Sequence, residues 1–270
     1  MKTYTNIELK HIFKETEKTF FAQSTFKKSQ LTEALEPFKQ IKKSKRKDND
    51  YFWVMVYVAF YSGFKATTVT NKIGAIQDFF GDLDKVSKYD EAKVQKIIDS
   101  NKVINHRQKI NGIIHNAKNI KAIQKEFGTF DKYLESFGDT DKDDNFFDLV
   151  KDLKKRFKYL GRITVFHFLT DIGFNVVKPD RVLCRIFNRL GLVDSEDDYA
   201  GVIKAGRQFS IASNVPIRYI DIIFVAYGQV GQKKEFGIKD GICLTTNPKC
   251  ELCGIYEYCQ YKKKKKIKWK

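Results

Sequence analysis

Four of the five cysteines lie within seventeen residues near the C-terminus, in the spacing Cys243-x6-Cys250-x2-Cys253-x5-Cys259. Four thiolates this close in sequence can close around one metal centre, which would dictate the fold of the whole segment. Zinc modules usually use two short C-x2-C corners separated by a longer span, whereas this segment has one such corner with a single cysteine on each side. The spacing therefore favours a 4Fe-4S cluster and leaves structural zinc as the alternative.

The sequence gives no sign of export or membrane insertion. The first residues, MKTYTNIELKHIFKETEK, contain no apolar signal-peptide core, and no stretch approaches the roughly 20 apolar residues of a membrane span. Disulfides are not expected, because reducing compartments keep thiols reduced. We therefore expect a soluble, intracellular protein in the cytoplasm, associated with the nucleoid if the source is prokaryotic.

The charge of the chain is strongly positive. There are 50 Lys and Arg against 33 Asp and Glu, a formal net charge of +17, and the body stays basic without the seven lysines of residues 262–270. This charge favours binding to the phosphate backbone of a nucleic acid. The alternative is a lysine-rich surface that is only solvated. We expect the tail, 262–270, to be disordered. It would either add phosphate affinity, with Trp269 stacking on a base, or serve solubility alone.

The apolar pattern is helical along most of the chain. Residues 51–62, YFWVMVYVAFYS, predict a buried helix that Gly63 ends, and residues 65–81 predict an amphipathic helix. Further helices are predicted over residues 90–100, 107–127, 130–137, 146–157, 163–173, 180–191, 198–211 and 215–229. No alternating strand pattern is present, so the fold class is all-α.

The cysteine spacing is the same as the C-x6-C-x2-C-x5-C pattern of the endonuclease III group of DNA glycosylases. The order of helices resembles the helix-hairpin-helix (HhH-GPD) superfamily to which that group belongs, and NKVINHRQKINGIIHNAKNI (101–120) is similar to 3-methyladenine DNA glycosylase I. The resemblance implies a six-helix barrel ending in the hairpin and a second helical subdomain closed by a 4Fe-4S loop. The corresponding segments are 1–50, packing with the cluster subdomain, 51–165 for the barrel, and 166–261 for the second subdomain.

The segment FKYLGRIT, 157–164, resembles the family's hairpin, a tight LPGxG turn whose amides and following helix hold a DNA phosphate. Gly161 matches the second glycine of that motif, but Tyr159 stands where the first is usual. The resemblance assigns DNA contacts to Leu160, Gly161, Arg162 and Thr164. An ordinary interhelical turn is the alternative.

Lys178-Pro179-Asp180 resembles the segment of the family that carries the catalytic aspartate. Asp180 precedes a predicted helix and is therefore also a good N-cap, a structural role that is compatible with catalysis. A carboxylate near the sugar would stabilise an oxocarbenium-like transition state or orient a water toward C1′. Bifunctional members carry a lysine where this chain has Ile163, and an isoleucine cannot form a Schiff base. The resemblance therefore implies a monofunctional glycosylase.

A glycosylase must flip its target base and fill the gap that the base leaves. The corresponding place here is Gly63-Phe64-Lys65-Ala66-Thr67, which we call the wedge segment (63–67). Lys65 matches the plugging glutamine of endonuclease III relatives, and Phe64 is a possible apolar wedge; a core phenylalanine and a surface lysine are the alternative. Lys249, between two cluster cysteines, matches basic residues that reach phosphate in relatives.

Aromatic residues of the 51–62 helix are candidates for the base pocket. Trp53, Tyr57 and Tyr61 could stack on a cationic alkylated purine, although aromatic residues at helical spacing are more often core. His167 and Cys184 are interpreted as packing residues. The prediction is a DNA repair glycosylase that acts as a monomer on double-stranded DNA, with an alkylated purine as substrate. The alternatives are a pyrimidine-damage or mismatch glycosylase, an inactive DNA-binding homologue, and a zinc-stapled helical interaction protein.

Overall fold

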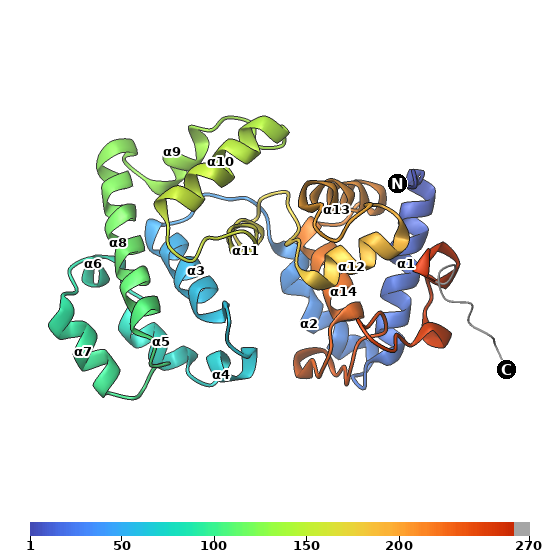
Figure 1. Cartoon of the computed structure of the whole chain (residues 1–270), viewed down its shortest axis with the longest axis horizontal. Helices are drawn as coiled ribbons and strands as arrows, with labels where there is room; N and C mark the ends of the chain where they lie inside the picture. Colours follow the sequence, from blue (N-terminus) through green and yellow to red (C-terminus); the bar gives the residue numbers. More distant parts are fainter. Residues whose placement is uncertain (262–270) are drawn as a thin grey trace. The chain divides into compact units, whose positions relative to one another are not determined.

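The computed structural model describes residues 1–261, apart from the side chain of Ala66; the predicted basic tail, 262–270, lies outside them. The chain divides into two compact units. Unit 2 is residues 43–172, and unit 1 combines residues 1–42 with the chain from Gly173 onward. Within the described residues all regular structure is helical, and the only strand-like pairing is an isolated bridge between Lys233 and Ile238 (Figure 1). The predicted all-α class is confirmed.

Unit 2 is built around one apolar helix. Its helices are α3 (Asp48–Tyr61), α4 (Ala66–Thr70), α5 (Ile73–Phe80), α6 (Leu83–Val86), α7 (Glu91–Asp99), α8 (Arg107–Phe127), α9 (Phe130–Glu135), α10 (Asp143–Arg156) and α11 (Thr164–Asp171). The predicted apolar run forms α3, which packs against α6, α8, α9 and α11. Phe52 and Phe60 are fully buried there, so hydrophobic burial around α3 holds the unit together.

The amphipathic helix predicted over residues 65–81 is interrupted in the structure. It forms two helices, α4 and α5, with a break at Asn71 and Lys72. α4 has the sequence ATTVT, and β-branched residues are weak helix formers. The Lys72 ammonium donates to the carbonyls of residues 101–103 at 3.1 to 3.2 Å. This tertiary contact fixes the break, and periodicity alone does not reveal it.

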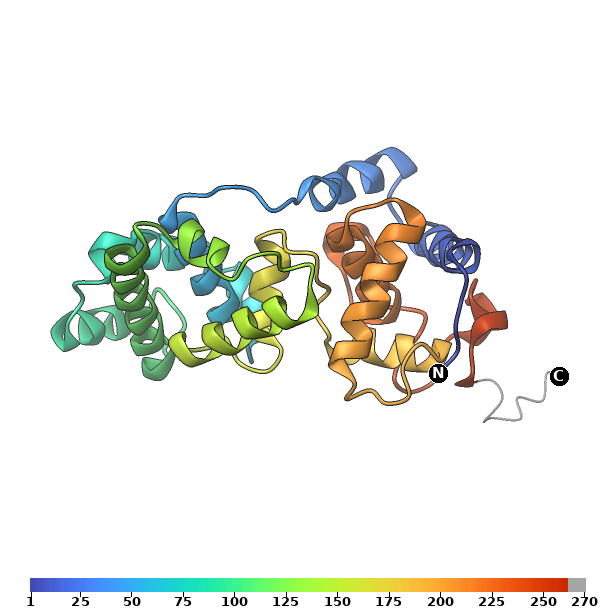
Figure 2. The ribbon, with the colours of Figure 1, turned by 90° about the horizontal axis from the view of Figure 1, so that it is seen from above.

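Unit 1 combines both ends of the chain. It contains α1 (Asn6–Gln23), α2 (Lys28–Gln40), α12 (Arg181–Leu190), α13 (Tyr199–Ser213), α14 (Ile217–Gly228) and the single turns η1 (Lys234–Phe236), η2 (Cys250–Leu252) and η3 (Tyr256–Tyr258). α1 packs against α13 and α14, and Figure 2 shows α1, in dark blue, beside the orange α13. Phe187, Phe209 and Phe224 form an aromatic centre with ring centroids 5.0 to 5.4 Å apart. These contacts bury the apolar faces of the helices from both chain ends in one core.

The N-terminal residues also hold the cysteine loop. The Lys2 ammonium and the Tyr4 hydroxyl each donate to the Tyr258 carbonyl at 3.3 Å. A Cβ atom at Gly254 would lie 2.3 Å from the hydroxyl oxygen of Thr19 in α1. The close approach of α1 to the loop thus requires a glycine at position 254.

Within residues 1–261 no single helix is both long and apolar enough to cross a membrane. One bent pair, α13 with α14 at 111°, meets the criteria by length and composition only.

Candidate active site and cysteine loop

The turn between α10 and α11 has an unusual backbone at Tyr159. Its φ is +64°, a left-handed conformation that glycine adopts freely but that costs other residues about 1–2 kcal/mol. The position where the hairpin motif usually has its first glycine is therefore occupied by a tyrosine in a glycine-like conformation. The ring packs against Gly112 of α8, where a Cβ atom would lie 2.5 Å from Tyr159 Cε2.

Side chains of α8 hold the main chain around this turn. Asn116 is 1% exposed; it donates to the Lys158 carbonyl at 2.9 Å and accepts from the Lys158 amide at 2.7 Å. Asn119 donates to the Arg156 carbonyl, and His115 lies 3.2 Å from the same oxygen. Since buried polar groups are costly to leave unpaired, these bonds fix the turn against α8.

The exposed part of the turn leads into the N-terminus of α11. Gly161 and Arg162 are exposed, whereas the Leu160 side chain lies in the core at 1% exposure. The Gly161 amide donates to Thr164 Oγ1 at 2.7 Å. The N-cap residue of α11, Ile163, makes no side-chain cap, and the amides of Val165 and Phe166 donate to the carbonyls of Gly161 at 3.3 Å and Ile163 at 3.1 Å. Leu160 could therefore reach a phosphate only through its main chain.

One buried lysine connects the hairpin with the wedge segment. Lys109 Nζ donates to the carbonyls that end α3, those of Ala59 at 2.5 Å and Ser62 at 2.6 Å. It also lies 4.5 Å from the ring centroid of Tyr159 and 5.2 Å from that of Phe64, distances at which cation–π attraction is effective. Burial lowers the pKa of Lys109. The hairpin and the wedge segment thus share one support.

The two candidate residues of the wedge segment differ in exposure. Phe64 is half-buried, and its ring lies perpendicular to that of His106 at a centroid distance of 5.9 Å. Lys65 is exposed and is the N-cap residue of α4. Lys65 is therefore the more accessible of the two.

The candidate base-pocket residues form a stripe on α3. Trp53, Tyr57 and Tyr61 are each four residues apart, so they share one face of the helix, and all three are half-buried. The Tyr57 and Tyr61 ring centroids are 4.2 Å apart with an interplanar angle of 33°. The Tyr61 hydroxyl lies 2.8 Å from Thr70 Oγ1. The stripe offers partly accessible aromatic surface on which a flat base can stack.

A polar pair from α11 lies beside this stripe. The His167 ring is 6.2 Å from that of Tyr57 at 73°, and its Nε2 atom lies 3.1 Å from Asp171 Oδ2, with both side chains less than one-fifth exposed. The interpretation of His167 as a packing residue is incomplete, because the imidazole has a carboxylate partner next to the aromatic stripe.

Asp180 is the N-cap of α12, as its position in the sequence predicts. Its Oδ1 atom accepts from the amides of Val182 at 2.9 Å and Leu183 at 3.1 Å. Its Oδ2 atom lies 3.5 Å from Lys178 Nζ, and the side chain is 22% exposed. One oxygen is thus engaged by the helix, and the carboxylate has a fixed orientation.

A second carboxylate holds the chain that leads to Asp180. Asp221 is 1% exposed, accepts from the Lys178 amide at 2.9 Å and pairs with Arg218. Burial raises the pKa of Asp221, and Arg218 acts in the opposite direction. Burial also lowers the pKa of nearby Lys233, which interacts electrostatically with Asp180. Asp221 thereby fixes the main chain two residues before Asp180.

All four cysteines of the loop line one cavity. Cys243, Cys250, Cys253 and Cys259 share it with Arg189, Lys249, Tyr256 and Tyr261, among others. Arg189 Nη1 donates to Cys243 Sγ at 3.2 Å, and the Tyr227 hydroxyl donates to Cys253 Sγ at 3.2 Å. Burial raises the pKa of the Cys253 thiol to about 11. Within residues 1–261, no three Cys, His, Asp or Glu side chains are placed to hold a single metal ion.

Two buried arginines of α12 surround the start of the cysteine loop. Arg185 is 5% exposed and Arg189 is 9% exposed. Arg185 donates to the carbonyls of Gly228 at 2.6 Å and Cys243 at 3.0 Å, and Arg189 donates to that of Leu244 at 2.8 Å. Neither guanidinium forms an ion pair with a carboxylate in the part of the chain that the structure describes. Two buried positive charges of α12 therefore lie beside the thiols of the loop.

Lys249 lies at the rim of the same loop. Its Nζ atom is 3.7 Å from Asp240 Oδ2, and its side chain is 32% exposed. It is thus partly accessible and loosely paired.

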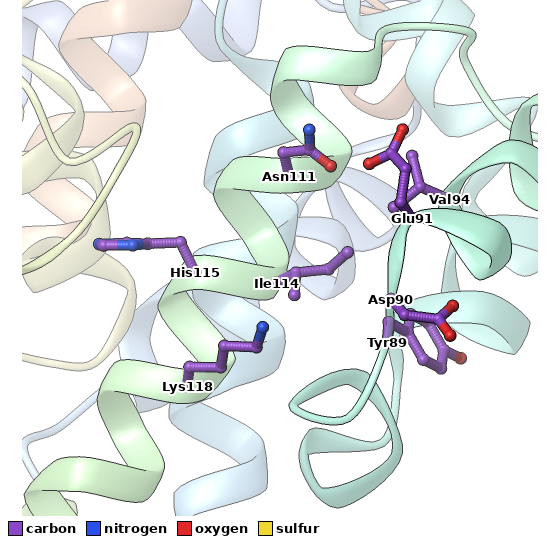
Figure 3. Close-up of a pocket in the computed structure, with 8 residues that line it drawn as sticks. All are labelled: Tyr89, Asp90, Glu91, Val94, Asn111, Ile114, His115 and Lys118. Atoms are coloured by element: carbon purple, nitrogen blue, oxygen red, sulfur yellow. The ribbon is translucent and has the colours of Figure 1, made fainter.

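A cavity of about 310 Å³ lies between α7 and α8 (Figure 3). Its lining residues are Tyr89, Asp90, Glu91, Val94, Asn111, Ile114, His115 and Lys118. Asp90 caps α7, and Glu91 pairs with Arg107. No predicted site residue lines it, so we do not assign it to the active site.

Comparison with known proteins identifies the family. Residues 41–185, just over half of the chain, match the family model for methyladenine glycosylase. The chain belongs to the methyladenine glycosylase family. It is therefore a DNA glycosylase, an enzyme that hydrolyses the N-glycosidic bond between a base and its sugar, and the predicted kinship with helix-hairpin-helix glycosylases is confirmed.

Solved structures of glycosylases are similar to this chain. An 8-oxoguanine DNA glycosylase of Thermotoga maritima is 18% identical with a TM-score of 0.50, over 80% of this chain and 95% of that chain. A 3-methyladenine DNA glycosylase I from Staphylococcus aureus is 25% identical with a TM-score of 0.44, over 52% of this chain and 84% of that chain. The first of these supports the fold.

Several residues around the site were not found from the sequence. Arg185 and Arg189 are four residues apart on the helix that Asp180 starts, so their shared face was a usable signal. Asn116, Lys109 and Asp221 gave no local signal, because their partners lie about 40 to 50 residues away in the sequence.

Proposed function

We propose that this glycosylase excises alkylated purines from double-stranded DNA, acting as a monomer, and leaves an abasic site without cutting the strand. The observation that carries this proposal is Asp180, a partly exposed carboxylate whose orientation is fixed by two amides and a lysine. The aromatic stripe on α3 and the exposed hairpin turn are the supporting features.

Asp180 supplies the charge that the reaction needs. Departure of the base leaves positive charge on the sugar, as in glycoside hydrolysis generally. A fixed carboxylate stabilises that charge and can orient the water that attacks C1′. Because Oδ1 is held by the helix amides, Oδ2 is the atom that would act on the sugar and the water.

The absence of a suitable lysine at position 163 makes the enzyme monofunctional. Strand cleavage by a glycosylase needs an amine that forms a Schiff base with C1′. Ile163, the N-cap residue of α11, has an aliphatic side chain. Borohydride should therefore trap no covalent complex with DNA, and strand breaks should appear only after alkali or heat.

The aromatic stripe favours a cationic base. Alkylation of a purine ring nitrogen gives it a positive charge, and a cation over tyrosine rings is attracted by about 0.5–2 kcal/mol. Tyr57 and Tyr61 present two such rings at 4.2 Å from each other. A stacking site of this kind binds the charged base better than its undamaged counterpart.

The cysteine loop fits a 4Fe-4S cluster. Its four thiols line one cavity, and four cysteine thiolates are the ligand set of such a cluster. The bound cluster together with its thiolates carries a negative charge. Arg185 and Arg189 provide buried positive charge at that place, and Arg189 already donates to a cysteine sulfur. The cluster would hold the loop and its Lys249 in place, without a part in bond cleavage.

The decisive assay uses duplex oligonucleotides that each carry one alkylated purine, oxidised purine, damaged pyrimidine or mismatch. We expect excision of the alkylated purine, and a loss of at least about 100-fold in Asp180→Asn, as is typical when a positioned acid–base group is removed. Asp198→Asn is the matched control, because Asp198 caps α13 in the same unit. Excision of pyrimidine lesions alone, or equal activity of both variants, would overturn the proposal.

The cofactor is tested separately. The purified protein should contain roughly four irons per chain and absorb at about 400 nm, and Cys250→Ser should lose both. Cys184→Ser is the control, since Cys184 lies in the core, 2% exposed, and outside the cavity. Stoichiometric zinc in a colourless protein would refute the cluster.

A further inference from the structure

His167 and Asp171 form a polar pair at the edge of the aromatic stripe. Tyr57, Tyr61 and His167 all belong to unit 2, and α11 packs directly against α3. The His167 ring is 6.2 Å from that of Tyr57. A base stacked on these tyrosines would therefore have a polar atom of its edge within reach of the imidazole.

The carboxylate of Asp171 determines which nitrogen faces a ligand. Nε2 lies 3.1 Å from Asp171 Oδ2, an ion-pair distance, so we assign a hydrogen to this nitrogen. Nδ1 makes no hydrogen bond within residues 1–261, and the side chain is 16% exposed. Asp171 thus acts on the ring as the carboxylate of a catalytic dyad does, and leaves Nδ1 for the substrate.

We propose that His167, positioned by Asp171, is a general acid that protonates the departing base when that base carries no positive charge. The inference rests on the proposed function, and it extends the substrate class from cationic alkylpurines to uncharged damaged purines.

The chemistry of the leaving group explains why only some bases need this proton. When the C1′–N bond breaks, its electron pair goes to the base. A cationic alkylpurine becomes neutral by that step, whereas an uncharged purine leaves as an anion unless it gains a proton.

The proton of the imidazolium at Nδ1 is transferred to a ring nitrogen of the base, and the neutral His167 regains a proton from solvent. Water supplies the hydroxyl group at C1′, and its proton passes to solvent. The Nε2 hydrogen stays between His167 and Asp171 throughout.

The test compares two lesions in one assay. Single-turnover excision is measured on matched duplexes with 7-methylguanine, which is cationic, or hypoxanthine, which is uncharged. We expect wild type to excise both. His167→Gln should lose about 100-fold or more on hypoxanthine, the scale of general acid catalysis, and tenfold or less on 7-methylguanine.

Two further variants test the role of the Asp171 carboxylate and provide a control. Asp171→Asn keeps an oxygen that accepts the Nε2 hydrogen but lacks the charge, so its loss on hypoxanthine should lie between wild type and His167→Gln. His11→Gln changes an exposed histidine of α1 and should keep the wild-type ratio of the two rates.

Each outcome decides the proposal. An equal loss on both lesions would make His167 a structural or stacking residue and overturn it. Wild-type activity on 7-methylguanine but none on hypoxanthine would also overturn it and leave the proposed function standing. Activity on neither purine would overturn this inference, and the lesion panel described above would then decide separately whether the proposed function stands.

Discussion

The ring of Tyr159 occupies the space that a side chain at position 112 would need, since a Cβ atom on Gly112 would lie 2.5 Å from Tyr159 Cε2. Gly112→Ala should therefore lower the free energy of unfolding by about 1–3 kcal/mol, as overpacking does. In a Tyr159→Gly background the same change should raise it by about 1 kcal/mol, because alanine is the better helix former in α8. Urea unfolding of the four proteins measures both values. Effects of the same sign in both backgrounds would contradict the packing described here.

Lys109 supports the ends of two segments that we expect to touch DNA. Lys109→Met keeps an apolar stem but leaves the Ala59 and Ser62 carbonyls without their donor. The free energy of unfolding should fall by about 1–3 kcal/mol, the cost of buried unpaired groups. Binding to lesion-free duplex, measured by fluorescence anisotropy, should weaken as well. Lys118→Met, at an exposed position of the same helix, should change neither quantity to this extent.

Lys249 provides a test of DNA contact that is independent of the proposed cluster. Lys249→Ala should weaken duplex binding and reduce the slope of log K against log salt by about 0.9, the value for one phosphate contact. Absorbance near 400 nm, which we attribute to the cluster, should not change. Lys10→Ala on the exposed face of α1 is the control. Loss of the chromophore in Lys249→Ala would show that this lysine holds the loop.

Buried tyrosines predict that stability falls at alkaline pH. Burial, together with a 2.8 Å hydrogen bond to Asp152, raises the pKa of Tyr133 above its ordinary 10.0. Below pH 10 the hydroxyl is neutral in both states and its contribution is complete. As the pH rises further, the unfolded chain ionises first, so stability is lost at up to about 1.4 kcal/mol per pH unit. Urea unfolding between pH 8 and pH 11 should show a steeper decline in wild type than in Tyr133→Phe. Parallel curves would refute this assignment.

The features that could be predicted from the sequence are those that depend on residues close together in the chain. The run of apolar residues in α3 and the aspartate at the start of α12 are local patterns, and both appear in the structure as expected. The break between α4 and α5 was missed, because Lys72 is held by carbonyls about 30 residues away. His167 and Asp171 are four residues apart and could have been paired from the sequence. Their position beside Tyr57 could not, since it depends on how α11 packs against α3.

The discontinuous unit 1 has a consequence for synthesis in the cell. α1 and α2 leave the ribosome first, but their partner helices α13 and α14 begin at Tyr199, after the whole of unit 2 has been made. Phe13 and Phe20, both buried in the finished protein, remain uncovered during that interval. Unit 2 can fold while the chain is still growing, whereas unit 1 must wait for translation of the cysteine loop. Chaperones would therefore have to cover these two side chains from the emergence of α1 until the last helices of unit 1 have been made.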